Sequence, residues 1–353
     1  MPLNINNQKL VITIPMSNTP SDAFTKSLPK SIPIIVIDDS NGNLTLDRKR
    51  FNTYDYKRQN KVLGEFYEDF RIFHHSSACR NLAHYLAYKF GFEVIIALDY
   101  DCKVPETFLS DHLNALRSKN ILGVSTNTGW INPLLNNRWY SRGYPYESRT
   151  PDLKFRFQKV KSPRVVLNSG LWENVLDINA IDKILSPPPK KISLKKNHLV
   201  VLGNIPISGM NNSFLREIIP AYFFLPNFRV GNWIVSRHDD IWGGYILEKL
   251  TNKKGDFITF GKPIVIHLRE SYQPQVLSYE HYIHLLSHHF YNLVDRAVEE
   301  IKKSDYKTMY AEFTEQFRKV LFKEKKHLPK TYFEGFKYLN KSMLWWVNLF
   351  KKL

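Results

Sequence analysis

Short apolar runs near the N-terminus predict the strands of a parallel sheet. They are KLVITIP (9–15) and IPIIVIDD (32–39), rich in β-branched residues and closed by turn-forming or acidic residues, as in strands buried on both faces. The segment SACRNLAHYLAYKF (77–90) carries apolar residues four positions apart and is followed by a glycine, which predicts a helix and its end. The run FEVIIALDYDC (92–102) then leads directly into acidic residues. This order predicts a doubly wound α/β sheet with acidic residues at the carboxyl end of a strand, where such folds bind ligands.

The rest of the chain divides into a loop-rich middle and a helical end. From about 122 to 212, Gly, Pro, Asn and Trp mix with short apolar runs, which predicts strands joined by long loops that form active-site walls. After Ser271, the segment HYIHLLSHHFYNLVDRAVEEIKK (281–303) carries an apolar stripe at helical spacing, as an amphipathic helix does. We therefore predict a catalytic α/β domain over residues 1–270 and a helical extension over residues 271–353.

The last apolar stretch, MLWWVNLFKKL (343–353), is far shorter than the roughly 20 apolar residues that a membrane-spanning helix needs. Its Trp345 and Trp346 lie close in sequence to Lys341 and Lys351. That combination fits either peripheral contact with a membrane surface or packing on the enzyme or on a partner subunit of a homo- or hetero-oligomer.

Composition restricts the partners. Lysine and arginine outnumber aspartate and glutamate by 50 − 33 = 17, which favours phosphorylated ligands, an anionic membrane or nucleic acid. Much of this charge lies in PPPKKISLKKNH (187–198) and after Lys302, where a solvated surface is an equally good explanation. No zinc-finger spacing or basic zipper occurs, so we expect no nucleic-acid partner beyond a nucleotide. Two cysteines and an N-terminus without a leader pattern lead us to expect a cytoplasmic protein.

The acidic turn after the run 92–102 is a candidate metal site. Departure of a nucleoside diphosphate places negative charge on the leaving group, and a hard cation such as Mn²⁺ or Mg²⁺ with oxygen ligands commonly neutralises it. Asp99 and Asp101 lie two apart at a strand end, so both can turn toward one ion. A simple strand-ending turn has the same pattern, but the apolar strand and the preceding helix favour the metal. His267 closes the strand PIVIH and is either a third ligand or a structural histidine.

Polar residues beside that turn are candidates for binding a nucleotide sugar. Arg80 and Asn81 lie in the first turns of the predicted helix, from which an arginine reaches a phosphate or a base edge. Asp38 and Asp39 end the second strand, where a carboxylate accepts hydrogen bonds from ribose or uracil. The alternatives are a surface arginine and a pair of capping or turn-forming aspartates.

Two adjacent carboxylates are candidates for catalysis. Asp239 and Asp240 precede an apolar segment with glycines in SRHDDIWGGY (236–245). One fits a catalytic carboxylate or a ligand of a substrate hydroxyl, while the other fits a helix cap.

Several motifs in order resemble one known family. They are SACR (77–80), LDYDC (98–102), RGYPYESR (142–149), SGLW (169–172), SGMNNSF (208–214) and RHDDIW (237–242). Over about residues 32–269 the chain resembles the reversibly glycosylated polypeptides, also known as UDP-arabinopyranose mutases. The resemblance implies a glycosyltransferase A-type, Rossmann-like mixed sheet flanked by helices, and a UDP-sugar as substrate.

The resemblance also implies roles for particular residues. Asp99 and Asp101 would bind the metal and the diphosphate, Arg142 would match the arginine that is reversibly glycosylated, and Arg149 would match the family's second arginine. Independently of the family, two guanidinium groups in a loop with Gly and Pro can face an anionic ligand; ordinary surface arginines are the alternative.

The chain also departs from the family pattern. Tyr100 stands where the family has the middle one of three consecutive aspartates, and Ser169 and Ser208 stand where plant members carry His and Cys. These positions lie near the expected substrate, so they bear on the reaction and on the sugar.

Three functions fit these observations. A UDP-sugar mutase would break the bond between sugar and diphosphate, change the ring size and re-form the bond, with metal and arginines stabilising the transient UDP. A glycosyltransferase would deliver the sugar to a lipid, glycan or protein acceptor, with Asp239 or Asp240 as base. A non-catalytic subunit would keep the fold alone, which intact Asp99, Asp101 and Arg80 argue against.

Overall fold

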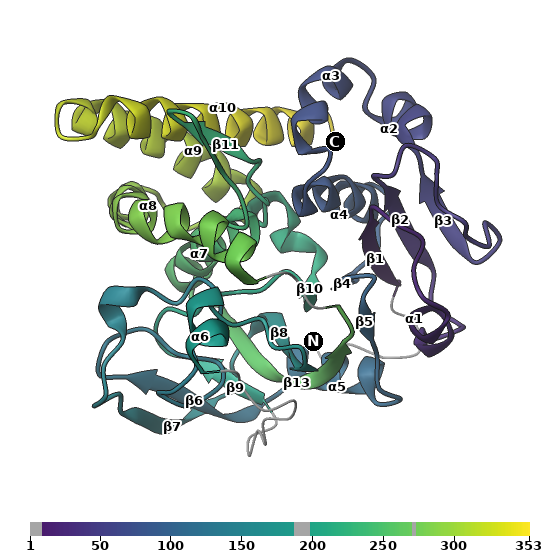
Figure 1. Cartoon of the computed structure of the whole chain (residues 1–353), viewed down its shortest axis with the longest axis horizontal. Helices are drawn as coiled ribbons and strands as arrows, with labels where there is room; N and C mark the ends of the chain where they lie inside the picture. Colours follow the sequence, from purple (N-terminus) through teal and green to yellow (C-terminus); the bar gives the residue numbers. More distant parts are fainter. Residues whose placement is uncertain (1–8, 187–197, 270–272) are drawn as a thin grey trace.

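A mixed β-sheet flanked by helices forms the centre of the molecule (Figure 1). The structure, a computed structural model, describes residues 9–186, 198–269 and 273–353. Within these ranges the sheet has eleven strands in the order β3-β2-β1-β4-β10-β8-β13-β9-β6-β7, with β5 paired to β13. The predicted α/β class with a helical C-terminal region is confirmed, and the arrangement is that of a glycosyltransferase A-like fold.

Four parallel strands make up one half of the sheet. They are β1 (Leu10–Met16), β2 (Ile34–Asp38), β3 (Phe51–Tyr54) and β4 (Val94–Leu98). Apart from one position in β3, all their residues are buried, which explains why three of them read as continuous apolar runs. The helices of this half are α1 (Asp22–Ser27), α2 (Tyr56–Leu63), α3 (Tyr67–Phe70) and α4 (Arg80–Lys89). Parallel pairing brings the carboxyl ends of β1, β2 and β4 to one edge, as predicted.

The other half of the sheet is mixed. Strand β10 (Asn211–Leu215) runs antiparallel between β4 and β8 (Val165–Asn174), and β8 pairs in parallel with β13 (Phe257–His267). The other strands and α-helices before the C-terminal region are β5 (Cys102–Lys103), α5 (Phe108–Leu116), β6 (Asn120–Thr126), β7 (Phe155–Lys161), α6 (Ala180–Leu185), β9 (His198–Val201), the hairpin β11 (Phe228–Val230) and β12 (Trp233–Val235), and α7 (Asp239–Lys254). The loop-rich middle is thus largely strands and loops, with α6 as a short helical exception. The basic run 187–197 lies outside the described residues.

The C-terminal helices share a core with the sheet domain. They are α8 (Gln273–Glu299), α9 (Tyr306–Lys323) and α10 (Lys330–Lys351), and one cluster of buried apolar side chains extends from Val11 to Phe350. Trp346 is fully buried, stacks on Phe223 and donates its Nε1–H to the carbonyl of Pro220 at 3.0 Å. For Trp345 and Trp346 the sequence allowed contact with a membrane surface or packing on the enzyme or a partner subunit. Packing on the enzyme is observed.

No described helix has the length and apolarity that crossing a bilayer requires. With both tryptophans buried, contact with a membrane surface would depend on exposed lysines such as Lys341 and Lys351. Peripheral membrane contact through the tail therefore stays a prediction.

Trp346→Ala should destabilise the whole protein. Truncating a buried tryptophan loses apolar burial, leaves a cavity and orphans a hydrogen bond, so the free energy of unfolding should fall by about 3–5 kcal/mol in urea denaturation. The matched control is Trp233→Ala, whose side chain is 59% exposed and which should cost about 0.5 kcal/mol or less. Equal effects of the two substitutions would contradict the shared core.

Candidate active site

Two adjoining cavities open at the carboxyl ends of the strands. The β1 cavity, of about 380 Å³, is lined by Pro15, Met16, Ser17, Asp39, His75, Ser76, Cys79 and Tyr100. The α7 cavity, of about 300 Å³, is lined by Arg142, Val175, Leu176, Asp177, Ile178, Lys183, Ser208, Met210, Arg237, Asp239, Asp240, His267 and Val276. The two cavities share Ser77, Arg80, Asp99, Asp101 and Arg269. A ligand with two unlike halves can therefore occupy both, with its middle at the shared wall.

The ion pair between Arg80 and Asp99 forms the centre of that wall. The two side chains meet at 2.6 Å, and Arg80 also donates to the carbonyls of Ser77 and Gly209. Burial raises the pKa of Asp99 despite the nearby guanidinium. Gly209 leaves no room for a side chain, because a Cβ there would lie 2.8 Å from Phe224. Both residues, which the sequence predicted as ligands of a nucleotide sugar, line the two cavities; their binding role stays a prediction.

Asn81, the neighbour of Arg80, lies outside both cavities. It is fully buried, and its amide donates to the carbonyl of Phe224 and accepts from the backbone N–H of the same residue. These two hydrogen bonds occupy the side-chain amide of Asn81 and link α4 to the segment that precedes β11. Its predicted role as a nucleotide ligand has no support in this geometry.

Asp101 and His267 face each other across the shared wall. The Nδ1–H of His267 donates to the carbonyl of Val175 at 2.7 Å, and its Nε2 lies 3.7 Å from a carboxylate oxygen of Asp101. Burial acts to raise the pKa of Asp101, but His267 outweighs it and the pKa is lowered. Burial likewise acts to lower the pKa of His267, and Asp101 reverses the direction. Among the described residues, no three His, Cys, Asp or Glu side chains come together as a metal site.

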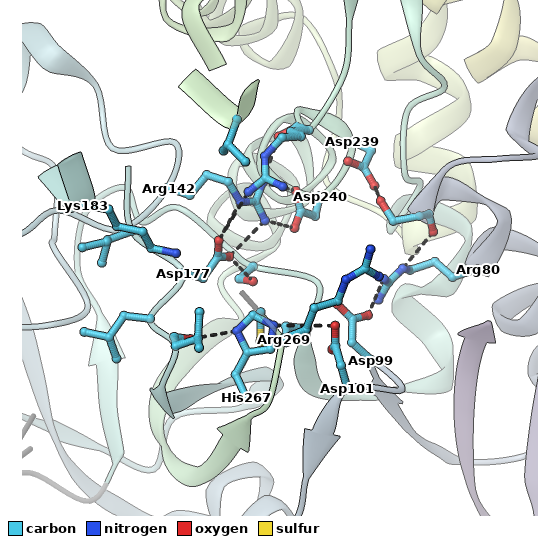
Figure 2. Close-up of a pocket in the computed structure, with 18 residues that line it drawn as sticks. Arg80, Asp99, Asp101, Arg142, Asp177, Lys183, Asp239, Asp240, His267 and Arg269 are labelled. Atoms are coloured by element: carbon cyan, nitrogen blue, oxygen red, sulfur yellow. Dashed lines mark hydrogen bonds and ion pairs between the residues drawn. The ribbon is translucent and has the colours of Figure 1, made fainter. Parts of the chain in front are cut away.

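Arg142 forms the wall of the α7 cavity opposite Arg80 (Figure 2). Its guanidinium donates twice to Asp177, twice to Asp240 and once to the carbonyl of Arg237, at 2.6 to 3.1 Å. An arginine has five N–H donors, so every one is occupied. Burial would raise the pKa of both carboxyls, but the charge of Arg142 holds each pKa below its usual value.

Arg149 lies behind this wall, outside both cavities. It pairs with Asp182 at 2.9 Å, and its guanidinium lies over the rings of Tyr140 and Tyr146. The structure therefore separates two arginines that the sequence treated alike, and the predicted catalytic role of Arg149 has no support in this geometry.

Asp239 differs from its neighbour in having no arginine bound to it. It lines the α7 cavity and accepts a hydrogen bond from the hydroxyl of Ser77. Burial and the adjacent charge of Asp240 raise its pKa to about 6. Asp239 and Asp240 thus have opposite pKa shifts, the pattern expected of a proton-transferring group beside a permanently charged one.

Asp38 and Asp39 have different roles at the end of β2. Asp39 lines the β1 cavity and accepts a hydrogen bond from the hydroxyl of Tyr56 at 3.1 Å, while burial raises its pKa to about 6. Asp38 lines neither cavity and caps the following turn by accepting from the N–H and hydroxyl of Ser40. Of the two predicted ligands, Asp39 alone faces a cavity.

Sequence reasoning missed several residues of the site. Arg237 and Arg269 lie within or beside motifs already recognised, in RHDDIW and two residues after His267, so their positions could have identified them. Asp177 and Lys183 belong to no motif, and only the fold brings them to the cavity. Ser208, noted as a family difference, donates to Asp177 at 2.8 Å.

The fold and the paired cavities together define a glycosyltransferase A-like protein with its candidate site at the strand ends. The chain belongs to the reversibly glycosylated polypeptide family, whose sequence model matches residues 6–353. It is 25% identical over 250 residues to UDP-arabinopyranose mutase 1 of Arabidopsis thaliana, which covers 67% of this chain and 65% of that protein. It is 26% identical over 230 residues to probable UDP-arabinopyranose mutase 1 of Pisum sativum, which covers 63% of this chain and 58% of that protein. The matched region thus spans less than two thirds of either relative.

Asp239→Asn should make the protein more stable at pH 8. Because the folded pKa of this carboxyl is raised from 3.8 to about 6, the native state binds more protons than the unfolded state in that window, and wild-type stability falls as pH rises through it. The neutral amide removes this loss, so the variant should gain about 1–3 kcal/mol at pH 8 and nothing below pH 4.

Asp240→Asn is the matched control and should have the opposite sign. It removes the charged acceptor of two N–H donors of the buried Arg142 guanidinium, at a cost of about 3–5 kcal/mol at neutral pH. Urea denaturation at pH 4, 6 and 8 measures both. If both variants lose stability equally at pH 8, the assignment of distinct charge states is wrong.

Proposed function

We propose that this chain is a UDP-sugar mutase that interconverts the pyranose and furanose forms of a UDP-linked sugar such as UDP-arabinose. The observation that carries the proposal is the pair of cavities with one charged wall in common. A nucleotide sugar has the same plan, with a nucleoside and a sugar joined by a diphosphate. The names of the matched relatives supply the reaction and the sugar.

The β1 cavity suits the nucleoside. It lies at the ends of parallel strands, where mononucleotides bind in doubly wound sheets. Asp39 offers a carboxyl to ribose hydroxyls or to the uracil N–H, and Tyr56 holds that carboxyl in place. Arg269 lines both cavities and donates to the hydroxyl of Tyr100, so it is placed to hold the diphosphate with Arg80.

A divalent cation, Mn²⁺ or Mg²⁺, fits Asp101 and His267. Because the Nδ1–H of His267 is committed to the carbonyl of Val175, Nε2 is the ring nitrogen that faces Asp101, and once deprotonated it would be oriented as in histidines that ligate metals. Asp99 keeps one oxygen for Arg80, so the protein would supply few ligands and the diphosphate and water the others, as is common for Mg²⁺. Such an ion would neutralise charge on the departing diphosphate.

The residues of the α7 cavity suit the sugar half of the reaction. In a mutase the electron pair of the bond between the anomeric carbon and the diphosphate oxygen passes to UDP and later returns, so the reaction is an isomerisation without an acceptor. When the ring opens, the bond between the anomeric carbon and the ring oxygen breaks and that oxygen takes up a proton. When the ring closes, another hydroxyl oxygen bonds to the anomeric carbon and loses its proton. Asp239, with a pKa of about 6, is suited to give and take that proton.

Arg142 supports this chemistry by holding Asp177 and Asp240 in place. Because all five of its donors are occupied, attachment of a sugar to one of its nitrogens would first have to break a charge-assisted bond. Glycosylation of Arg142 stays a prediction of the family resemblance.

The proposed function predicts one product. Incubation with UDP-arabinopyranose and Mn²⁺, followed by chromatography, should yield UDP-arabinofuranose and no net release of UDP. Asp239→Asn should lower kcat by about 100-fold or more because a general acid–base group is lost, whereas Asp22→Asn at an exposed position should leave it unchanged. Sugar transfer to an added acceptor with free UDP would instead identify a glycosyltransferase.

The metal proposal predicts a pH-dependent affinity. With UDP present, Asp101→Asn and His267→Gln should each weaken Mn²⁺ binding by about tenfold or more. In the wild type the affinity should fall as the pH falls below the raised pKa of His267, because the metal competes with a proton. Calorimetry and Mn²⁺ electron paramagnetic resonance measure this, with exposed His288→Gln as control. Unchanged affinity in both site variants would refute the assignment.

A further inference from the structure

The first helix of the C-terminal extension forms part of the active-site wall. Three residues at four-residue spacing share one face of α8: Val276, which lines the α7 cavity, Glu280 one turn later, and His284 after another turn. His284 contacts the side-chain oxygen of Asn179 at 3.1 Å and stacks on Tyr146. This face of α8 therefore packs against the loops that form the wall of the cavity.

Glu280 is a fully buried carboxylate with two distinct partners. One oxygen accepts the backbone N–H of Ala180 at 2.8 Å, at the first residue of α6. The other oxygen lies 3.6 Å from the guanidinium of Arg237. Burial raises the pKa of Glu280, and Arg237 is the nearest charge that opposes the shift.

Arg237 contacts Glu280 and also lines the α7 cavity. Its side chain is 34% exposed and lines the α7 cavity, with its guanidinium also 3.9 Å from Asp177. Its φ of 63° lies in the left-handed region, which residues other than glycine rarely adopt, and its carbonyl accepts from Arg142. The backbone is thus fixed by Arg142, and the side chain is held between carboxylates on two sides.

We propose that Glu280 is a positioning residue that holds the guanidinium of Arg237 over the α7 cavity, so that Arg237 donates hydrogen bonds to the sugar half of a bound nucleotide sugar. The statement that Arg237 binds the sugar rests on the proposed function. The statement that Glu280 holds Arg237 in place does not. A charged carboxylate at this depth is stable only with a counter-charge, and the guanidinium held in this way belongs to a partly exposed side chain that lines the α7 cavity. The C-terminal extension then determines affinity for the sugar.

The substitution Glu280→Gln removes the ion pair with Arg237 and keeps the hydrogen bond from the backbone of Ala180. The amide oxygen still accepts the N–H of Ala180, so α6 stays anchored, while the charge that holds Arg237 is lost. The design is a double-mutant cycle with Arg237→Ala, with exposed Glu299→Gln on the same helix as control. Each protein is assayed by urea denaturation and by calorimetry with UDP alone and with UDP-arabinopyranose.

The expected result has two parts. In unfolding, the effects of Glu280→Gln and Arg237→Ala should be non-additive, as for residues in direct contact. In binding, Glu280→Gln should weaken affinity for UDP-arabinopyranose by about tenfold, the loss of one charge-assisted hydrogen bond, and should have no further effect when Arg237 is alanine. Affinity for UDP should change by less than about threefold, because Arg237 does not line the β1 cavity.

Additive unfolding effects would overturn the proposal whatever the ligand, because the two side chains would not be coupled. Non-additive unfolding with sugar affinity unchanged by Glu280→Gln would also overturn it, leaving a purely structural ion pair. Binding without turnover in the wild type would refute the mutase function alone, since the cycle is measured on affinity and stability.

Discussion

Arg142 joins three segments that are distant in the sequence. Its guanidinium lies between Asp177, which follows β8, and Asp240, at the start of α7, and it also bonds the carbonyl of Arg237. Two carboxylates and one guanidinium are buried together there, and removing either carboxylate would leave two N–H donors of the guanidinium without their charged acceptor, at a cost of about 3–5 kcal/mol. The shape of the α7 cavity therefore depends on this one side chain.

Pairing with a buried arginine gives the acidic residues of the site different charge states. Asp177 and Asp240 are held ionised by Arg142, and Asp99 is paired with Arg80. Asp239 accepts a hydrogen bond from Ser77 and is left with a raised pKa. Carboxyl groups within one cavity thereby acquire different protonation behaviour, which the proposed isomerisation requires, since one group must exchange protons while others hold the substrate.

Sequence patterns predicted the sheet and the edge at which the two cavities lie, because buried parallel strands read as apolar runs and acidic residues end two of them. They also identified Asp39, Arg80, Asp99 and Asp239 beside the cavities. They did not separate Asn81 from Arg80 or Arg149 from Arg142, because orientation toward a cavity is set by tertiary contacts. Asp177 and Glu280 were missed for the same reason: their partners lie 35 and 100 residues away, and the local sequence carries no trace of them.

The central claim is that nucleoside and sugar occupy separate cavities that meet at Arg80 and Asp99. A crystal structure of the protein with UDP-arabinopyranose and Mn²⁺ tests it most directly. The account predicts uridine beside Asp39 in the β1 cavity, the diphosphate at the shared wall, and the sugar in the α7 cavity within hydrogen-bonding distance of Asp239. A sugar that points away from the α7 cavity into solvent, or a nucleoside bound in the α7 cavity, would contradict it.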